Sequence, residues 1–222
     1  MSPAASRKRS PGVPTRPVGG MQARAERTRA LIMDEAVRCV VEEGFDAASA
    51  KHIAERAGVT WGVIQYHFGD RDGLLAAVVD SGFDELRAHM ATVDVPRGST
   101  RERVSAIVDA AWAAFATETS RASLEILVAT RARREQATDE HLVAMAGELA
   151  RLGRDLIGDR HGVGDAAAIG DLLWATLRGL VLTQMMTDTP IDTTRERAAL
   201  VDLLTAGLDS EPPTPVRELR HG

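Results

Sequence analysis

The sequence has little cysteine, few aromatic residues and no long apolar run, and each of these absences excludes a class of protein. Cys39 is the only cysteine. An intramolecular disulfide therefore cannot form, a cysteine-based zinc site is not expected, and Cys39 itself is predicted to be a small buried side chain. Because no run of about 18 apolar residues occurs, we expect no membrane-spanning helix. The N-terminus also lacks the apolar segment of a secretion signal, so we predict a cytoplasmic protein.

Motifs of common enzyme classes are missing as well. The sequence has no glycine-rich phosphate loop, no GxSxG and no HExxH. Its six histidines are scattered, and the one loop grouping that we single out is His161 with Asp159 and Asp165. We therefore predict no enzymatic activity, no bound metal and no cofactor.

Charge is divided unevenly along the chain. The net charge is −5, yet residues 1–75 contain 11 basic and 9 acidic residues while the remainder contains 16 basic and 23 acidic residues. A basic front on an acidic body allows one face to approach phosphate groups while the other face is repelled.

The hydrophobic periodicity predicts an all-α protein of about nine helices. The chain divides into four segments, of which the two central ones are helical. Residues 1–22 are rich in Pro, Gly and Ser and are expected to form a disordered arm, whose cluster Arg7, Lys8, Arg9 and Arg16 either lies along a DNA groove or serves only solubility. Residues 23–70 are predicted to form a helix-turn-helix domain, with its first helix over about 25–43. Residues 71–209 are predicted to form a second helical domain, and residues 210–222 a flexible tail.

The helix-turn-helix is predicted from local capping signals. Ser49 is expected to cap a helix over residues 50–57, which Gly58 ends in a left-handed turn. Thr60 is expected to cap a second helix over residues 61–67. Two short helices joined by a glycine-containing turn of three or four residues are typical of a helix-turn-helix.

The side chains near this turn suit contact with DNA. Lys51 supplies charge for phosphate, the hydroxyls and helix N-termini at Ser49 and Thr60 favour phosphate, and Gln65 can form a bidentate pair with adenine. Gly62 permits close approach of the backbone. The candidate DNA-binding residues are Ser49, Lys51, Thr60, Trp61, Gly62, Val63, Gln65, Tyr66 and Arg71.

The segment from Gly44 to Val78 resembles the DNA-binding region of the TetR/AcrR family of repressors, and the resemblance spans residues from about 24 to 80. The residues that carry the resemblance are Gly44, Phe45, Ser49, Ile53, Ala54, Ala57, Gly58, Val59, Thr60, Gly62, Tyr66, His67, Phe68, Arg71, Leu74 and Leu75. The sequence departs from the family pattern at Trp61, Val63 and Gln65, which are base-facing or near-phosphate positions. The operator sequence therefore cannot be transferred from a relative, and His67 is interpreted as a packing residue.

The resemblance implies a homodimer, formed by the last two long helices at about 166–188 and 194–208. The first of these has two apolar stripes, Ile169, Leu172, Leu173, Leu177 and Leu180 on one and Trp174, Val181, Leu182 and Met185 on the other. Both stripes require cover, which agrees with a dimer. A two-fold dimer would place its recognition helices about 34–36 Å apart on a palindromic operator of double-stranded DNA.

The resemblance also implies a cavity for a small-molecule ligand, whose binding would release the repressor from DNA. Polar or aromatic residues within apolar stripes are the candidate lining: Trp112, Phe115, Glu125, Arg131, Trp174, Arg178 and Gln184. Two alternatives stay open. One is a DNA-binding regulator that is controlled by a protein partner without an inducer, and the other is a helical adaptor that binds proteins only.

Overall fold

The computed structural model describes residues 18–133, 136–157, 166–187, 189 and 191–209. The described residues form nine α-helices and no strand, which confirms the all-α prediction. Their bounds are α1 (Val18–Glu43), α2 (Ala50–Arg56), α3 (Trp61–Phe68), α4 (Arg71–Ala91), α5 (Thr100–Phe115), α6 (Glu118–Thr130), α7 (Gln136–Ile157), α8 (Ala166–Met185) and α9 (Thr194–Asp209). Within the described part of the chain, no helix is long and apolar enough to cross a membrane.

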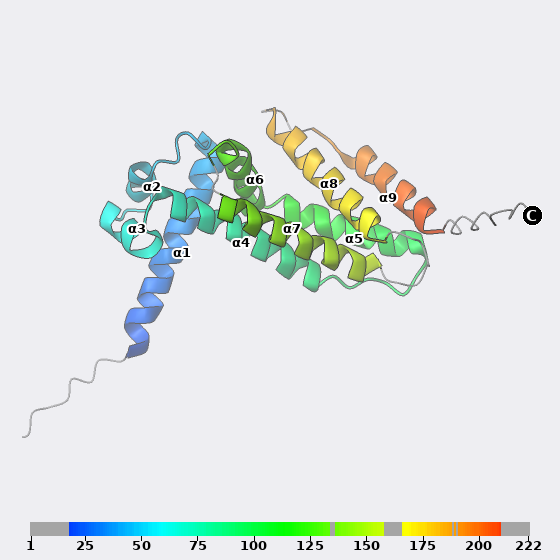
Figure 1. The fold of residues 1–222 in the computed structure, drawn as a ribbon, viewed down its shortest axis with the longest axis horizontal. Helices are drawn as coiled ribbons and strands as arrows, with labels where there is room; N and C mark the ends of the chain where they lie inside the picture. The colour runs from blue at the N-terminus through cyan, green and yellow to red at the C-terminus, as the bar shows by residue number, and fades with distance from the viewer. Residues whose placement is uncertain (1–17, 134–135, 158–165, 188, 190, 210–222) are drawn as a thin grey trace, which may run out of the picture.

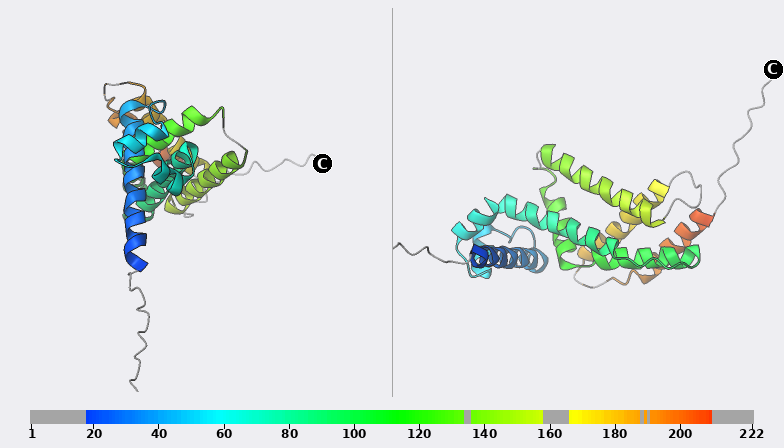
Figure 2. Two further views of the ribbon diagram at one scale, coloured as in Figure 1. Left: turned by 90° about the vertical axis from the view of Figure 1, so that its left-hand side faces the viewer. Right: turned by 90° about the horizontal axis from the view of Figure 1, so that it is seen from below.

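Helices α1 to α3 gather at one end of the molecule, and α5, α7, α8 and α9 form an elongated body at the other (Figure 1). The N-terminal half of α1 projects beyond its neighbours in two perpendicular views (Figures 1 and 2). The buried face of α1 contains Ile32, Ala36, Cys39 and Val40, all fully inaccessible. These positions recur at the spacing of one helix face, as the sequence predicted, and the buried state of Cys39 is confirmed.

Helices α4 and α6 connect the two ends because each contributes to two hydrophobic clusters. The first half of α4, including Leu74 and Val78, packs with α1 to α3, whereas Leu86 and Met90 pack with the body. Figure 2 shows α4 running from the N-terminal helices along the body. On α6, Ile126 belongs to the N-terminal cluster and Leu124 to the cluster of the body. A shift of either helix therefore changes packing in both clusters.

Helix α8 buries one face and exposes apolar residues on another. Its buried face consists of Leu173, Trp174, Leu177 and Val181, while Leu172 is 52% exposed. The two predicted stripes were therefore divided wrongly, since Trp174 and Val181 lie on the same face as Leu173 and Leu177. Helix α9 buries Leu200 and Leu204 and leaves Leu203 69% exposed.

Several predicted boundaries differ from the structure. Helix α1 begins at Val18, so residues 18–22 of the predicted disordered arm are helical. Helix α8 ends at Met185, three residues before the predicted end. The arm's basic cluster at residues 7–16, the tail at 210–222, and His161 with Asp159 and Asp165 lie outside the described residues.

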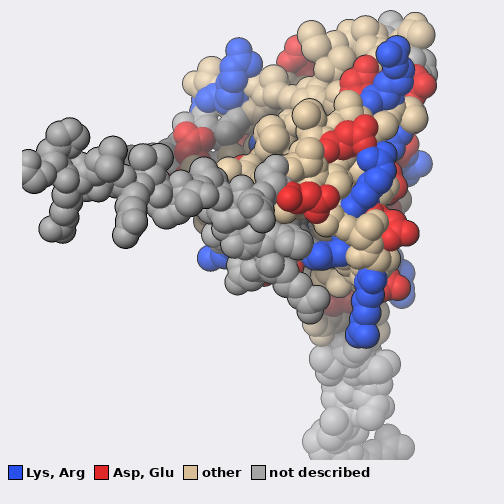
Figure 3. All heavy atoms as spheres, turned by 90° about the vertical axis from the view of Figure 1, so that its right-hand side faces the viewer, with Lys and Arg blue, Asp and Glu red and all other residues tan. Residues whose placement is uncertain are grey.

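The end of the body that lies farthest from α2 and α3 carries basic and acidic side chains in alternation. On the part of this face that Figure 3 leaves uncovered by grey atoms, Lys and Arg side chains are interleaved with Asp and Glu. A face of mixed charge attracts phosphate only weakly, because neighbouring charges of opposite sign cancel over a short distance.

Candidate nucleic-acid interface

Helix α2 is held in place by caps at both ends. The Ser49 backbone is extended, and its hydroxyl oxygen accepts a hydrogen bond from the backbone N–H of His52 at 3.2 Å. After α2, Gly58 adopts φ +65°, a conformation that costs little only for glycine. Both features confirm the sequence prediction, and together they determine where the chain turns into α3.

Helix α3 begins without the predicted side-chain cap. Thr60 occupies the N-cap position with an extended backbone, but its hydroxyl makes no capping hydrogen bond. Val59 and Ile64 both join the N-terminal cluster, with Ile64 fully buried. Packing of these two residues, rather than a hydroxyl cap, therefore fixes the start of α3. The exposed Thr60 hydroxyl is free to meet a phosphate.

The outer face of α3 presents mostly large side chains to solvent. Tyr66 is 81% exposed and Trp61 is 42% exposed. Gly62 and Gln65 are exposed as well. The predicted outward projection of Val63 is wrong, because Val63 is half-buried against the N-terminal cluster. Consecutive residues of a helix are about 100° apart, so Val63 lies about 200° from Trp61 and turns inward, whereas Gln65 shares the outer face with Trp61.

Lys51 is the exposed cation of α2. Its side chain is 87% exposed, and its ammonium lies 3.8 Å from the carboxylate of Glu55. An exposed ion pair of this length contributes little, so the ammonium can exchange Glu55 for a phosphate.

Arg71 was a candidate for DNA contact, but its guanidinium is bound within the chain. It donates hydrogen bonds to the backbone carbonyls of Ala48 at 2.7 Å and Phe45 at 2.9 Å. It also stacks on the Phe45 ring, with its central carbon 4.6 Å from the ring centroid. In this position Arg71 clamps the loop before α2 to the start of α4, and we remove it from the proposed DNA contacts.

The structure adds the projecting part of α1 to the candidate interface. Arg24 and Arg27 are exposed there. The guanidinium of Arg29 lies over the ring of Phe68, the last residue of α3, at 5.0 Å. Arg27 and Arg29 fall within the predicted first helix, but helical periodicity does not reveal that this part of the helix projects beside α3. The only signal was the excess of basic residues before residue 30.

Ion pairs between charged side chains join α1 to α2. Arg56 forms ion pairs with Glu35 at 3.3 Å, with Glu42 at 2.8 Å and with Glu43. Hydrogen bonds to these carboxylates raise the pKa of Arg56. The hydrogen bond from His52 and, next, that from Arg56 lower the pKa of Glu43.

Among the described residues, one group has the composition of a metal site. Donor atoms of Cys39, Glu43 and His52 lie within 4.8 Å of one another. Burial is the main cause that raises the pKa of the Cys39 thiol, which opposes the thiolate that a metal requires. Arg56 already supplies the positive charge beside Glu43. We therefore interpret this group as part of the ion-pair network between α1 and α2.

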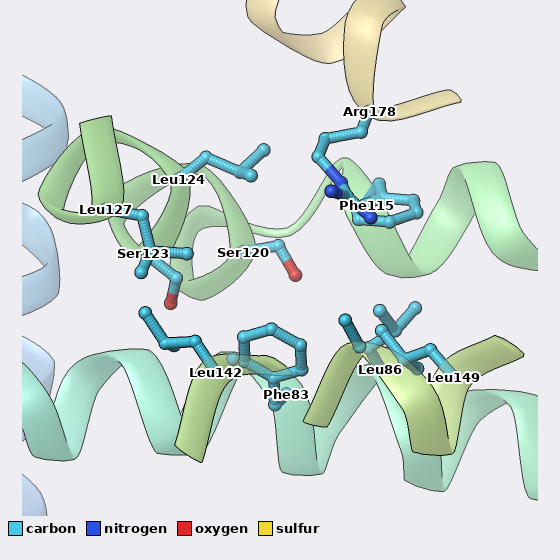
Figure 4. A pocket seen from close by; sticks show the side chains of 12 residues that line it. Phe83, Leu86, Phe115, Ser120, Ser123, Leu124, Leu127, Leu142, Leu149 and Arg178 are labelled. Carbon is cyan, nitrogen blue, oxygen red and sulfur yellow. The ribbon is translucent and has the colours of Figure 1, made fainter. Parts of the chain in front are cut away.

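The regulatory body contains an apolar cavity of about 190 Å³. Of the candidate ligand-binding residues, Phe115 and Arg178 line it, and Figure 4 shows the Arg178 side chain extending from α8 toward the cavity beside Phe115. The remaining lining residues come mainly from α4, α6 and α7, and sequence reasoning missed them because an apolar residue on a helix stripe gives no sign of facing a cavity. They are Gly82, Phe83, Leu86, Ser120, Ser123, Leu124, Leu127, Leu142, Ala146 and Leu149.

The other five ligand-binding candidates have different positions. Trp174 is buried and donates to the carbonyl of Leu149 at 2.9 Å, so it is a core residue. The central guanidinium carbon of Arg197 lies over the Trp112 ring, 4.8 Å from the ring centroid. Arg131 is exposed and donates to the carbonyl of Val128. None of these three residues lines the cavity.

Glu125 and Gln184 lie together beside a separate polar groove between α6 and the end of α8. The Glu125 carboxylate accepts a hydrogen bond from the backbone N–H of Phe45 at 2.6 Å. The Gln184 amide donates to the carbonyl of Ile191 at 2.9 Å. Both were predicted to line the ligand cavity, and the structure instead gives each a structural hydrogen bond.

Comparison with known proteins shows that the N-terminal region is similar to that of a family of bacterial regulators. Residues 32–78 match the sequence model of the family described as bacterial regulatory proteins, tetR family. The HTH-type transcriptional regulator BetI of Rhizobium meliloti (strain 1021) is 29% identical over 195 residues, which cover 84% of this chain and 94% of BetI.

Solved structures share the fold over most of the chain. A bacterial regulatory protein in the tetR family from Rhodococcus RHA1 aligns with a TM-score of 0.65 at 17% identity, covering 82% of this chain and 97% of that one. NalD, the secondary repressor of the MexAB-OprM multidrug efflux pump in Pseudomonas aeruginosa, aligns with a TM-score of 0.60 at 20% identity, covering 84% and 98% respectively. At these identities the likeness concerns the arrangement of helices.

Proposed function

Because this chain belongs to the TetR family of DNA-binding transcriptional regulators, we propose that it is a homodimeric repressor that a small molecule releases from a palindromic operator. The observation that carries the proposal is the exposed face of α3. Trp61, Gln65 and Tyr66 extend into solvent from a helix whose opposite face is anchored by the fully buried Ile64. A short helix whose inner face is anchored in the core, and whose outer face carries large exposed side chains, suits insertion into the major groove.

The proposed contacts divide into two classes. Gln65, Trp61 and Gly62 face the bases, while Lys51, Tyr66 and the hydroxyls of Ser49 and Thr60 contact phosphates. Phosphate contacts fix the position of the helix on the duplex, and base contacts supply sequence preference. Arg24 and Arg27 on the projecting part of α1 extend the basic surface next to α3.

The dimer is proposed to form through α8 and α9. Leu172 and Leu203 are large apolar side chains that the single chain leaves more than half exposed. A second copy related by two-fold symmetry would cover both, since a two-fold interface uses the same patch on each subunit. NalD, which shares the fold, is described as a repressor, and repression is the direction of regulation that we propose for this chain.

Release by a ligand requires a physical connection between the cavity and α3. Ser123, which lines the cavity, lies on α6 within hydrogen-bond distance of the Val78 carbonyl of α4, at 3.0 Å. Two residues further along α6, the Glu125 carboxylate accepts a hydrogen bond from the backbone N–H of Phe45, whose ring and carbonyl contact Arg71. A ligand that shifts α6 against α4 would therefore move the loop before α2. The ligand can change operator affinity only by its difference in affinity for the two arrangements.

A gel-shift titration tests the regulator function directly. The full chain is titrated with DNA from upstream of its own gene, with a scrambled duplex as control, at several salt concentrations. We expect a complex that prefers one sequence, weakens as salt rises and protects a palindrome. A protein-binding adaptor would form no such complex, and its absence on every genomic fragment would refute the proposal.

A further inference from the structure

The cavity in the regulatory body contains a single charged group. Its walls are apolar side chains, two serines and Arg178. No carboxylate lines it, and within the described part of the chain Arg178 has no ion pair or hydrogen bond. Burial lowers the pKa of the Arg178 guanidinium, but arginine retains its proton in proteins. A positive charge without a partner therefore faces an apolar space.

The two serines cannot offer their hydroxyl protons to a ligand. The Ser120 hydroxyl donates to the Ala114 carbonyl at 2.9 Å. The Ser123 hydroxyl lies 3.0 Å from the Val78 carbonyl and 2.7 Å from the Thr119 carbonyl, and it has one proton for these two acceptors. Among the lining side chains, the guanidinium of Arg178 is consequently the group with N–H donors to spare.

This arrangement selects the charge of a ligand. A partly buried cation without a counter-charge is costly, and an anion that forms hydrogen bonds with it removes that cost. The planar fork of arginine matches the two oxygens of a carboxylate. An amine or quaternary ammonium would instead place a second positive charge in the same apolar space.

We propose that the cavity binds a small amphipathic organic carboxylate, with its carboxylate on Arg178 and its apolar body between α4, α6 and α7. This inference rests on the proposed function, because it names the ligand class of the same regulator. Phe83, Leu124 and Leu142 line the space that this apolar body would fill (Figure 4). A dry apolar cavity of about 150 Å³ accommodates benzene. The cavity here, at about 190 Å³, therefore has room for a single ring or a short chain with its head group.

Three probes of equal chain length separate charge from apolar contact. Octanoate, octanol and octylammonium are each titrated into the full chain without DNA, and binding is followed by calorimetry. We expect octanoate to bind about tenfold or more tightly than octanol, the ratio that a charged hydrogen bond supplies, and octylammonium to bind more weakly than either. Equal binding of octanoate and octylammonium, or no binding of octanoate, would overturn the proposal.

The variant Arg178→Met tests the residue itself, since methionine keeps the apolar stem and removes the fork. We expect its octanoate affinity to fall about tenfold or more while octanol still binds, which shows that the cavity remains folded. The matched control is Arg97→Met, which removes an exposed arginine from the loop between α4 and α5. If Arg178→Met retained full octanoate affinity, the assignment of the carboxylate to Arg178 would be wrong.

Ligand binding and DNA binding by this chain are tested in separate assays. Ligand binding is measured on the protein alone, and the gel shift is measured without ligand. A sequence-preferring complex with DNA together with no selectivity for octanoate would refute the ligand class and leave the regulator intact. Selective octanoate binding with no DNA complex would refute the regulator function.

Discussion

Gln65 is the residue on which sequence preference is expected to depend. It is exposed on the outer face of α3, and its side chain makes no hydrogen bond within the described residues. We predict that Gln65→Ala weakens operator binding by about 1–3 kcal/mol and relaxes preference at one base pair. The measurement is a competition gel shift against operators that are varied one position at a time.

Lys51→Ala provides the contrast to Gln65→Ala. Removing a phosphate contact should weaken binding to all sequences alike and reduce the salt slope by about one. If the two variants gave the same profile, the division into base and phosphate contacts would be incorrect.

Arg71 holds the loop before α2 in place, a structural role that the sequence pattern did not predict. Arg71→Met leaves the carbonyls of Phe45 and Ala48 without their donor in a half-buried site. We therefore predict a loss of about 1–3 kcal/mol in the free energy of unfolding, measured by urea denaturation. Lys51→Met, which removes an exposed cation, should change stability by less than about 0.5 kcal/mol. Unchanged stability of Arg71→Met together with lost DNA binding would restore Arg71 to the DNA contacts.

The difference between Arg71 and Ser49 shows what a sequence can reveal. Ser49 caps α2 by accepting a hydrogen bond from the N–H of His52, three residues later, so its role follows from local spacing. Arg71 binds carbonyls 23 and 26 residues earlier, and no local signal indicates that contact. The contact of Glu125 is even harder to predict from the sequence, because its partner Phe45 lies 80 residues away.

At the scale of elements, the sequence predicted helices well where caps and glycine turns mark their ends. Gly44 and Gly58 both adopt positive φ, as expected of residues that end helices. The beginning of α1 was placed too late, because low helix propensity at Gly19 and Gly20 suggested coil. The cavity could not be predicted, since its lining is assembled from residues of α4 to α8 that meet only after packing.

The crossing of α4 and α6 depends on a residue without a side chain. Gly82 is buried, and a Cβ at this position would overlap the Ser123 hydroxyl and lie 3.0 Å from the Ser123 Cβ. We predict that Gly82→Ala forces the two helices apart and destabilises the protein by about 1–3 kcal/mol. Thermal and urea unfolding measure the change.

Gly147→Ala is the matched control for Gly82→Ala. Gly147 is exposed on α7 and has no atom within 4 Å of its would-be Cβ. Alanine there should stabilise the helix by about 0.5–1 kcal/mol. If Gly82→Ala were equally stabilising, close packing would not explain the glycine at the α4–α6 crossing.

At the scale of the whole molecule, two cores share two helices. Because α4 and α6 each pack into both hydrophobic clusters, the N-terminal helices cannot move independently of the body. The loop before α2 is fixed from both sides, by Arg71 on α4 and by Glu125 on α6. This double attachment connects the helices that line the cavity to the loop before α2, and a population shift between two α4–α6 arrangements would act through it.

Pairing of two such molecules would depend on the exposed apolar side chains of α8 and α9. Leu203 is 69% exposed on α9, so Leu203→Asp should leave the isolated chain folded. In the proposed dimer the same change buries two unpaired carboxylates, and we expect dimerisation to weaken by roughly 3 kcal/mol or more, about a hundredfold. Val143→Asp places the same charge at a 71% exposed position of α7 and should leave the dimer intact. Sedimentation velocity separates the outcomes: monomeric Leu203→Asp with reduced operator affinity supports the α8–α9 interface, whereas a dimer of unchanged affinity places the interface elsewhere.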